Sequence, residues 1–220
     1  EFDNIRTIVT ELSKEPETKG WKDIINKVLI GHEYPQVGTN ERPRDFQFEL
    51  LMAALCKKAG FKLTLEEPDI IIHDDLINYA VAAKRPKSYV NLPKTIKKAC
   101  KQIEKSGYDG IIAIDISKLE NPQNNRLGYT KRADVLPAII KIADSFYERN
   151  SRKFHRDINT DKVFGIIIYV EILTYYMVKP QIGYSNRMSI ISLCNKTDKR
   201  YHFIRKVAVK LGESQNSSKT

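Results

Sequence analysis

A carboxylate and an ammonium group stand at the ends of two short apolar stretches in the first half of the chain. Asp69 precedes a run of three isoleucines, and Lys84 follows the apolar residues 79–83. The polar residues 73–75 between the two stretches predict a turn, so the whole segment predicts a hairpin of two strands. The start of the first strand then meets the end of the second, which brings the two charged groups together. Such a pair suits the binding of a metal ion and a phosphate.

A helix is predicted on each side of this hairpin. The first helix, over 45–59, has Asp45 as its expected N-cap and Gly60 as its C-cap. The helical period places Glu49 on the inward side of this helix. An unpaired charge is costly there, so the carboxylate needs a lysine, a metal ion or water as partner. The alternative is a partly exposed glutamate at the edge of the inward side.

The second helix, over 92–106, has one apolar face and one lysine face. Five lysines fall within an arc of about 100° at 100° per residue, and they are Lys94, Lys97, Lys98, Lys101 and Lys105. A stripe of this kind is usually a solvated face, but its position directly after the hairpin favours contact with phosphates. Gln102 flanks the stripe and can reach toward the hairpin.

The rest of the chain alternates strand and helix patterns, which predicts an α/β domain. Strands are expected at 61–67, 110–117, 163–176 and 184–195, helices at 133–149 and 198–211, and irregular segments at 119–132 and 149–162. We divide the chain into an N-terminal helical segment packed on the core (1–44), a single domain (45–211) and a disordered tail (212–220). The N-terminal segment should contain helices over 3–14 and 21–29, followed by a loop over 31–44.

The composition favours a polyanionic partner. The chain of 220 residues carries a formal charge of +10, which fits nucleic acid or an anionic membrane surface. No apolar run reaches the ~18 residues of a membrane-spanning helix, and the acidic start does not read as a signal peptide. The three widely spaced cysteines, with no CxxC among them, argue against a zinc cluster or disulfide framework and fit a reducing cytoplasm.

At this point the chain resembles the PD-(D/E)XK nuclease superfamily, which has the restriction-endonuclease-like fold. Its signature is Pro-Asp at one strand and acidic-x-Lys at the next. Pro68-Asp69 matches the first half, Ala82-Ala83-Lys84 occupies the second, and Arg85-Pro86 is a common family ending. Glu49 matches the glutamate that the preceding helix often supplies. The resemblance covers about residues 45–117 and implies a central mixed sheet flanked by helices in the order αβββαβ, here with extra N-terminal helices.

The resemblance implies a Mg²⁺-dependent DNA nuclease, with Mn²⁺ as a possible substitute. Asp69 would be the central metal ligand, the main-chain carbonyl of Ala83 another, and Glu49 would hold metal-bound water or a second ion. Lys84 would orient the attacking water and stabilise charge in the transition state. Gln102 completes the candidate catalytic set. The residues expected to contact nucleic acid are Arg85, Lys87, Lys94, Lys97, Lys98 and Lys101.

The motif departs from the family at Ala82, where the resemblance implies a second carboxylate ligand. A methyl group cannot ligate a metal ion. Three explanations remain: substitution of an active-site glutamate, a natural member that only binds, or an acidic group that has moved, for which Glu104 is the candidate. We favour the first, because the other family residues are retained. We therefore expect this chain to bind Mg²⁺ poorly and to cut DNA little or not at all.

Three functions are weighed on this basis. The leading one is a nuclease for double-stranded DNA, an endonuclease of restriction or defence type, disabled at position 82. The second is a nucleic-acid-binding protein that uses the same fold without catalysis and binds in a salt-sensitive, metal-independent way. In the third, Asp69 and Lys84 form only a structural ion pair.

Family analogy also suggests a homodimer, partner subunits of a restriction or phage-defence system, and a cytoplasmic location in a prokaryotic or phage-related setting. Three tyrosines at strand ends, Tyr175, Tyr176 and Tyr184, could stack on bases, but core or rim positions are commoner for such residues.

Overall fold

The structure is a computed structural model that describes residues 2–13, 25, 26, 28, 42–75 and 77–216. The described helices are α1 (Phe2–Leu12), α3 (Arg42–Lys58), α4 (Leu92–Ser106), α5 (Ser117–Glu120), α6 (Val135–Asp157) and α7 (Lys199–Asn216), with a 3₁₀ turn η1 (Arg132–Asp134). The described strands are β1 (Lys62–Thr64), β2 (Ile70–Asp74), β3 (Ile77–Lys84), β4 (Asp109–Asp115), β5 (Leu127–Tyr129), β6 (Val163–Tyr176) and β7 (Gln181–Ser192).

Seven strands form one mixed sheet in the order β1-β2-β3-β4-β6-β5, with β7 also paired to β6. The pairs β1–β2, β2–β3 and β6–β7 are antiparallel, and the pairs β3–β4, β4–β6 and β5–β6 are parallel. Because β7 pairs along nearly all of β6, β4 and β5 share the other edge of β6. The predicted α/β class is confirmed, and the elements from α3 to β4 follow the order αβββαβ.

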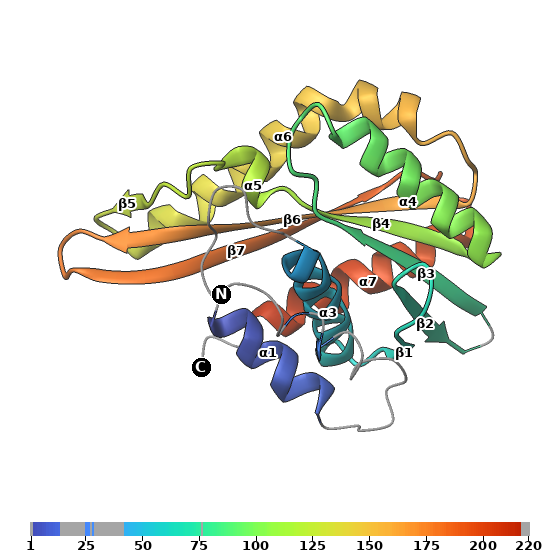
Figure 1. Cartoon of the computed structure of the whole chain (residues 1–220), viewed down its shortest axis with the longest axis horizontal. Coiled ribbons are helices and arrows are strands. Elements are labelled where there is room, and N and C mark those ends of the chain that lie inside the picture. The colour runs from blue at the N-terminus through green and yellow to red at the C-terminus, as the bar shows by residue number, and fades with distance from the viewer. Residues whose placement is uncertain (1, 14–24, 27, 29–41, 76, 217–220) are drawn as a thin grey trace.

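Helices cover both faces of the sheet (Figure 1), with α4 and α6 on one side and α1, α3 and α7 on the other. Successive side chains of a strand point to opposite faces. In β3, Val81 and Ala83 accordingly belong to the core beneath α1, α3 and α7, whereas Ala80 and Ala82 belong to the core beneath α4 and α6. The sheet therefore has two separate hydrophobic cores, one on each face.

The predicted hairpin and the helix after it are confirmed. β2 and β3 pair antiparallel with Ile70 opposite Val81. The helix α4 has the predicted bounds because Pro93 lies in its first turn and Gly107 follows it in the left-handed conformation, at a φ of 80°. Its buried residues all lie on the predicted apolar face, and they are Leu92, Ile96, Ala99, Cys100 and Ile103.

The helix before the hairpin begins earlier than predicted. Residues 42–44 belong to α3 rather than to a loop, since proline is tolerated in the first turn of a helix. Asp45 is therefore a residue of the first turn and not the N-cap. In the first turn its negative charge still complements the helix dipole. At the N-terminus, α1 confirms the first predicted helix, and its Ile8 and Leu12 are buried in the core shared with α3. The remainder of the predicted helix 21–29 and loop 31–44 lies outside the described residues, apart from the helical residues 25, 26 and 28.

Two helices are longer than predicted. The basic segment after residue 149 continues α6 to Asp157, because Asn150, Phe154 and Asp157 extend the buried side of that helix. The side-chain amide of Asn150 donates to the carbonyl of Phe146 within the helix. Likewise α7 runs to Asn216, so residues 212–216 are helical and not part of a disordered tail. The short strand β5 lies within the predicted irregular segment 119–132, and the short helix α5 begins two residues before that segment.

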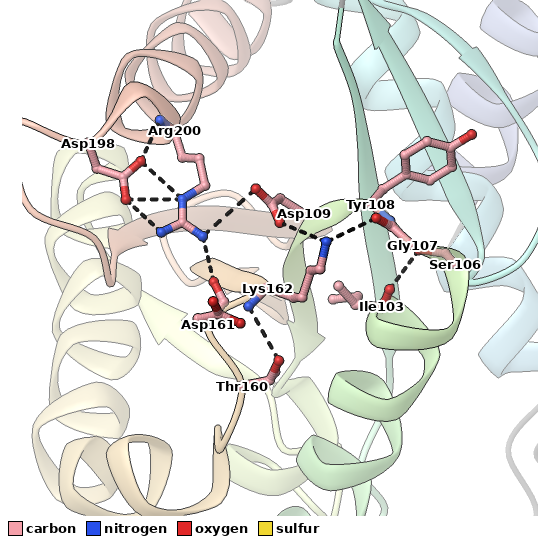
Figure 2. Close-up of polar contacts among 10 residues, drawn as sticks. All are labelled: Ile103, Ser106, Gly107, Tyr108, Asp109, Thr160, Asp161, Lys162, Asp198 and Arg200. Atoms are coloured by element: carbon pink, nitrogen blue, oxygen red, sulfur yellow. Dashed lines mark hydrogen bonds and ion pairs between the residues drawn. The ribbon is translucent and has the colours of Figure 1, made fainter.

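Arg200 fastens the start of α7 to the amino ends of β4 and β6 (Figure 2). Its guanidinium donates to both carboxylate oxygens of Asp198, with the shortest contact at 2.6 Å, and to the carbonyl of Asp161 at 2.5 Å. Asp109 lies 3.8 Å from Arg200 and 3.5 Å from the Lys162 ammonium, which also donates to the carbonyl of Gly107. This network lies at the edge of the sheet where β4 and β6 begin, opposite the edge where β3 and β4 end. None of the described helices is long and apolar enough to cross a membrane.

Candidate functional site

Asp69 and Lys84 meet at the end of the hairpin, as the sequence predicts. The Lys84 ammonium donates to Oδ2 of Asp69, and the same oxygen accepts the main-chain N–H of Ala83 at 2.7 Å. Lys84 also donates to the carbonyl of Ala83 at 3.0 Å. Only 10% of the Asp69 side chain and 11% of the Lys84 side chain are exposed. The two charges therefore form a nearly buried ion pair fixed by the main chain of β3.

The strand register explains why this pair forms. Ile70 pairs with Val81, so one further step along an antiparallel ladder sets Asp69 opposite Ala82. Lys84 lies two residues beyond Ala82, on the same face of β3. Asp69, position 82 and Lys84 are thus neighbours on the face covered by α4 and α6.

Burial is the main influence on the acidity of Asp69. It raises the pKa of the carboxyl group from 3.8 to about 6, although the charge and hydrogen bond of Lys84 and the Ala83 N–H act in the opposite direction. The negative charge of Glu67 raises the pKa further. The carboxyl group of Asp69 can therefore take up a proton close to neutral pH.

Ala82 has no exposed surface and belongs to the core beneath α4 and α6. Its methyl group stands where the second carboxylate of the family motif would lie. Glu104, the candidate for a displaced acidic group, is exposed. Burial is the largest cause of the raised pKa of Cys100, and the negative charge of Glu104 raises that pKa as well. The acidic residue that acts on Asp69 is instead Glu67, two residues earlier in the chain.

The residues around Asp69 do not complete a Mg²⁺ site. Magnesium prefers oxygen ligands from one or two carboxylates together with water. Here Oδ2 of Asp69 and the carbonyl of Ala83 both accept hydrogen bonds from the Lys84 ammonium, and position 82 offers only a methyl group. Within the part of the chain that the structure describes, no group of three or more His, Cys, Asp or Glu residues could hold a metal ion. As the chain stands, an internal ammonium group compensates the charge of Asp69.

Gln102 lies beside the segment that leads into Asp69. Its amide nitrogen donates to Oε1 of Glu67 at 3.0 Å and, more weakly, to the carbonyl of Pro68 at 3.4 Å. The other amide atom, Oε1, is buried and has no hydrogen-bond partner among the residues that the structure describes. Gln102 reaches toward the hairpin, as predicted, but it contacts the residues before Asp69 and so has the geometry of a positioning residue.

Glu49 lies on the other side of the sheet. It is half-buried on α3, between Phe48 and Leu50, which belong to the core beneath α1, α3 and α7. The structure thus brings Asp69, Ala83 and Lys84 together and sets Glu49 on the helix that covers the opposite face. The catalytic role suggested for Glu49 stays a prediction.

A second polar group at the ends of β3 and β4 is not evident from the sequence. The Arg85 guanidinium, which the sequence assigns to nucleic acid, forms an ion pair with Oδ2 of Asp115 at 3.1 Å. Oδ1 of Asp115 accepts the N–H and the hydroxyl of Ser117 at 2.9 and 2.5 Å, and the same hydroxyl accepts the N–H of Glu171 at 2.8 Å. Asn4 of α1 then donates to Oε2 of Glu171 at 2.7 Å. The sequence indicates this polar group only through Asp115, a carboxylate at the end of a buried strand.

The lysine face of α4 is exposed along its whole length. Lys97 lies 3.6 Å from the buried carboxylate of Asp157 on α6. The other lysines of the face form no ion pair with any described residue, and they are Lys94, Lys98, Lys101 and Lys105. Lys87, in the loop between β3 and α4, is also exposed. A surface rich in lysine therefore covers α4 and extends to Lys87 beside the hairpin.

A scan against protein-family models and a search of the curated proteins both find no match to this sequence. The chain is an α/β protein with a mixed seven-strand sheet flanked by helices and a nearly buried aspartate–lysine pair at one hairpin end.

Proposed function

We propose that this chain is a DNA-binding domain with the architecture of a Mg²⁺-dependent PD-(D/E)XK endonuclease, disabled for cleavage at position 82. The observation that carries the proposal is the grouping of Asp69, Ala82 and Lys84 on one face at the end of the hairpin. This is the arrangement that the family motif requires, with one ligand missing. The order of elements from α3 to β4 supports the same assignment.

Positive charge supports DNA as the partner. The formal charge is +10, and four lysines of α4 are exposed without a described carboxylate partner. Lysines that neutralise phosphates release counterions, which stabilises binding to a duplex at low salt. The helix α4 follows the hairpin directly in sequence, and its apolar face, opposite the lysines, packs over the core that contains Ala82.

The missing carboxylate explains why this chain should bind rather than cut. Cleavage of a phosphodiester in this family needs a divalent ion. The oxygen ligands that remain here, on Asp69 and Ala83, already accept hydrogen bonds from Lys84. A glutamate at position 82 would lie opposite Asp69 and add the missing oxygen ligands. The proposal therefore predicts that a single substitution restores metal-dependent cleavage.

The test is plasmid cleavage in Mg²⁺ and in Mn²⁺, and EDTA serves as a blank. It compares the present chain with Ala82→Glu, with Ala82→Gln, which has the same bulk but no charge, and with the double variant Ala82→Glu/Lys84→Met. We expect nicked or linear plasmid from Ala82→Glu alone. Equal, metal-independent activity in the present chain and in Ala82→Glu would show that the site is wrongly assigned.

Folding has to be monitored because position 82 has no exposed surface. A larger side chain in a packed core costs about 1–3 kcal/mol, and an unpaired charge costs more. Circular dichroism and thermal unfolding of Ala82→Gln report the cost of the bulk alone. Inactive Ala82→Glu protein that is folded, and a present chain that binds DNA in EDTA, would favour the alternative function, a nucleic-acid-binding protein without catalysis.

The geometry also provides an observation for that alternative. The Lys84 ammonium contacts both oxygens that the family assigns to the metal, so this site is electrostatically complete without a divalent ion. If Asp69→Ala lowers the stability but leaves both DNA binding and the activity of Ala82→Glu unchanged, the pair has only a structural role.

A further inference from the structure

The outer parts of β6 and β7 form a ribbon that leaves the body of the protein. The last β6 residue paired with β4 is Tyr169, and β6 continues to Tyr176. Seven further residues span roughly 23 Å at 3.3 Å per residue. Figure 1 shows that the tip of this ribbon projects past the helices on both faces of the sheet. We call the ribbon tip, with β5 and the first residue of η1 beside it, the arm. It comprises residues 126–132 and 174–184, and Asp134 at the end of η1 is the acidic residue nearest to it in sequence.

The arm carries positive charge and no negative charge. Residues 121–133 and 172–197 contain neither aspartate nor glutamate. Four basic residues of the arm are exposed, namely Arg126, Lys131, Arg132 and Lys179. Arg132 donates to the side-chain oxygen of Gln181 at 3.2 Å, and none of the four forms an ion pair with a described carboxylate. A partner of the arm should therefore be rich in negative charge.

Apolar and aromatic side chains stand between these cations. Met177, Val178, Ile182 and Tyr184 are 51%, 62%, 52% and 43% exposed at or near the tip. The rings of Tyr129 and Tyr176 stack with their centres 5.3 Å apart. A hollow of about 250 Å³ lies between β5, η1 and β7, and Tyr129, Arg132 and Gln181 are among its lining residues. Exposed apolar groups of this number indicate an interaction surface rather than a solvated loop.

We infer that the arm contacts duplex DNA and inserts its tip into the major groove. The groove is about 12 Å wide and admits a two-stranded ribbon, whose strands lie about 4.8 Å apart. Because β5 pairs with β6 at 174–176, the part of the arm that can enter the groove is the turn beyond Tyr176. The cations at the sides of the ribbon then face phosphates, and the apolar and amide groups at the tip face base edges, including thymine methyl groups. This inference rests on the proposed function in one respect, that the chain binds DNA at all.

Charge favours DNA over a second copy of this chain. Pairing of two arms would bring eight cations together with no carboxylate between them, four from each copy. Like charges at a contact oppose association unless they are compensated. A DNA duplex compensates them directly, so self-association becomes an outcome that the experiment must exclude.

The test compares two triple variants that each remove three positive charges. The arm variant is Lys131→Gln/Arg132→Gln/Lys179→Gln. The control variant is Lys196→Gln/Lys199→Gln/Arg205→Gln, which changes exposed residues at and just before α7, at the other end of β6. Fluorescence anisotropy with a 30-base-pair duplex measures the affinity between 50 and 200 mM KCl.

We expect the arm variant to bind more weakly and with a lower dependence on salt. At 0.1 M salt each lost phosphate contact lowers the affinity about 8-fold, and the slope of log K against log salt falls by about 0.9 per contact. The control variant should stay within about 2-fold of the present chain, because general loss of charge has only a weak effect at this salt. Lys179→Glu, in the exposed turn at the tip, provides a second variant that perturbs folding least.

Each alternative outcome has a separate meaning. If the present chain binds the duplex and the arm and control variants are equally affected, the arm inference is wrong while the proposed function stands. If the present chain binds no DNA at 50 mM KCl, the proposed function fails first. If light scattering shows that the arm variants change the oligomeric state and not the DNA affinity, the arm is a self-association surface and the inference is overturned.

Discussion

The most direct physical test concerns the proton on Asp69. Burial raises the pKa of this carboxyl group from 3.8 to about 6 in the folded protein. The two values differ by about 2, and at 1.36 kcal/mol per unit this corresponds to roughly 3 kcal/mol of folding free energy. Asp69→Asn removes the titrating group and keeps a side-chain oxygen that can accept from Ala83 and Lys84.

The sign follows from which state holds the proton more tightly. Between about pH 4 and pH 6 the folded chain keeps the Asp69 proton and the unfolded chain releases it, because the pKa is higher in the folded state. The free energy of unfolding of the present chain should therefore fall by up to about 3 kcal/mol as the pH rises from 4 to 7. In Asp69→Asn this contribution is absent, so the variant gains stability relative to the present chain over the same range.

Urea unfolding at half-unit steps from pH 4 to pH 7.5 measures the effect. Only the difference between the two proteins is interpreted, since all other titrating groups are shared. Asp74→Asn serves as a control, because Asp74 ends β2, which begins directly after Asp69, and pairs with Lys206 at the surface, where an ion pair contributes about 0–1 kcal/mol. Parallel stability curves for the present chain and Asp69→Asn would refute the reasoning about burial at this site.

Two further predictions concern the core and the cysteines. Gly165→Ala should destabilise the fold by about 1–3 kcal/mol in urea unfolding, because the added Cβ would lie 2.1 Å from a methyl carbon of Ile204. Gly183→Ala is the control, since its added Cβ would make only ordinary van der Waals contact. Equal losses of stability in the two variants would contradict the packing argument. With a thiol reagent at pH 8, half-exposed Cys194 should react first, and the two buried cysteines only after unfolding, because burial raises the pKa of their thiols to about 12 and about 11. Rapid reaction of all three thiols in the folded protein would contradict this assignment.

Local sequence was sufficient to predict the hairpin and the helix that follows it. Two apolar runs joined by a short polar turn pair as an antiparallel hairpin, and this pairing brings Asp69 and Lys84 together. The helix 92–106 was predicted to the residue because its ends carry a proline and a glycine. In both cases the decisive contacts are close in the chain.

Interactions distant in sequence account for what was missed. The continuation of α6 to Asp157 depends on burial of Phe154 and on Lys97 of a different helix. A basic composition alone suggested an irregular segment there. The polar chain from Arg85 through Asp115 to Glu171 and Asn4 joins residues up to 167 positions apart, and no local pattern indicates such a contact.

The packing of α7 has a consequence for how the protein is made. Phe203 stacks on Tyr79 at 3.8 Å and also contacts the rings of Phe61 and Phe164. A nascent chain that already contains the complete αβββαβ segment and its Asp69–Lys84 pair still lacks Phe203, so α1 and α3 cover this face of β3 only in part. The rings of Phe61 and Tyr79 therefore stay partly exposed until α7 has been synthesised, and apolar surface exposed in this transient way is prone to aggregation and to chaperone binding.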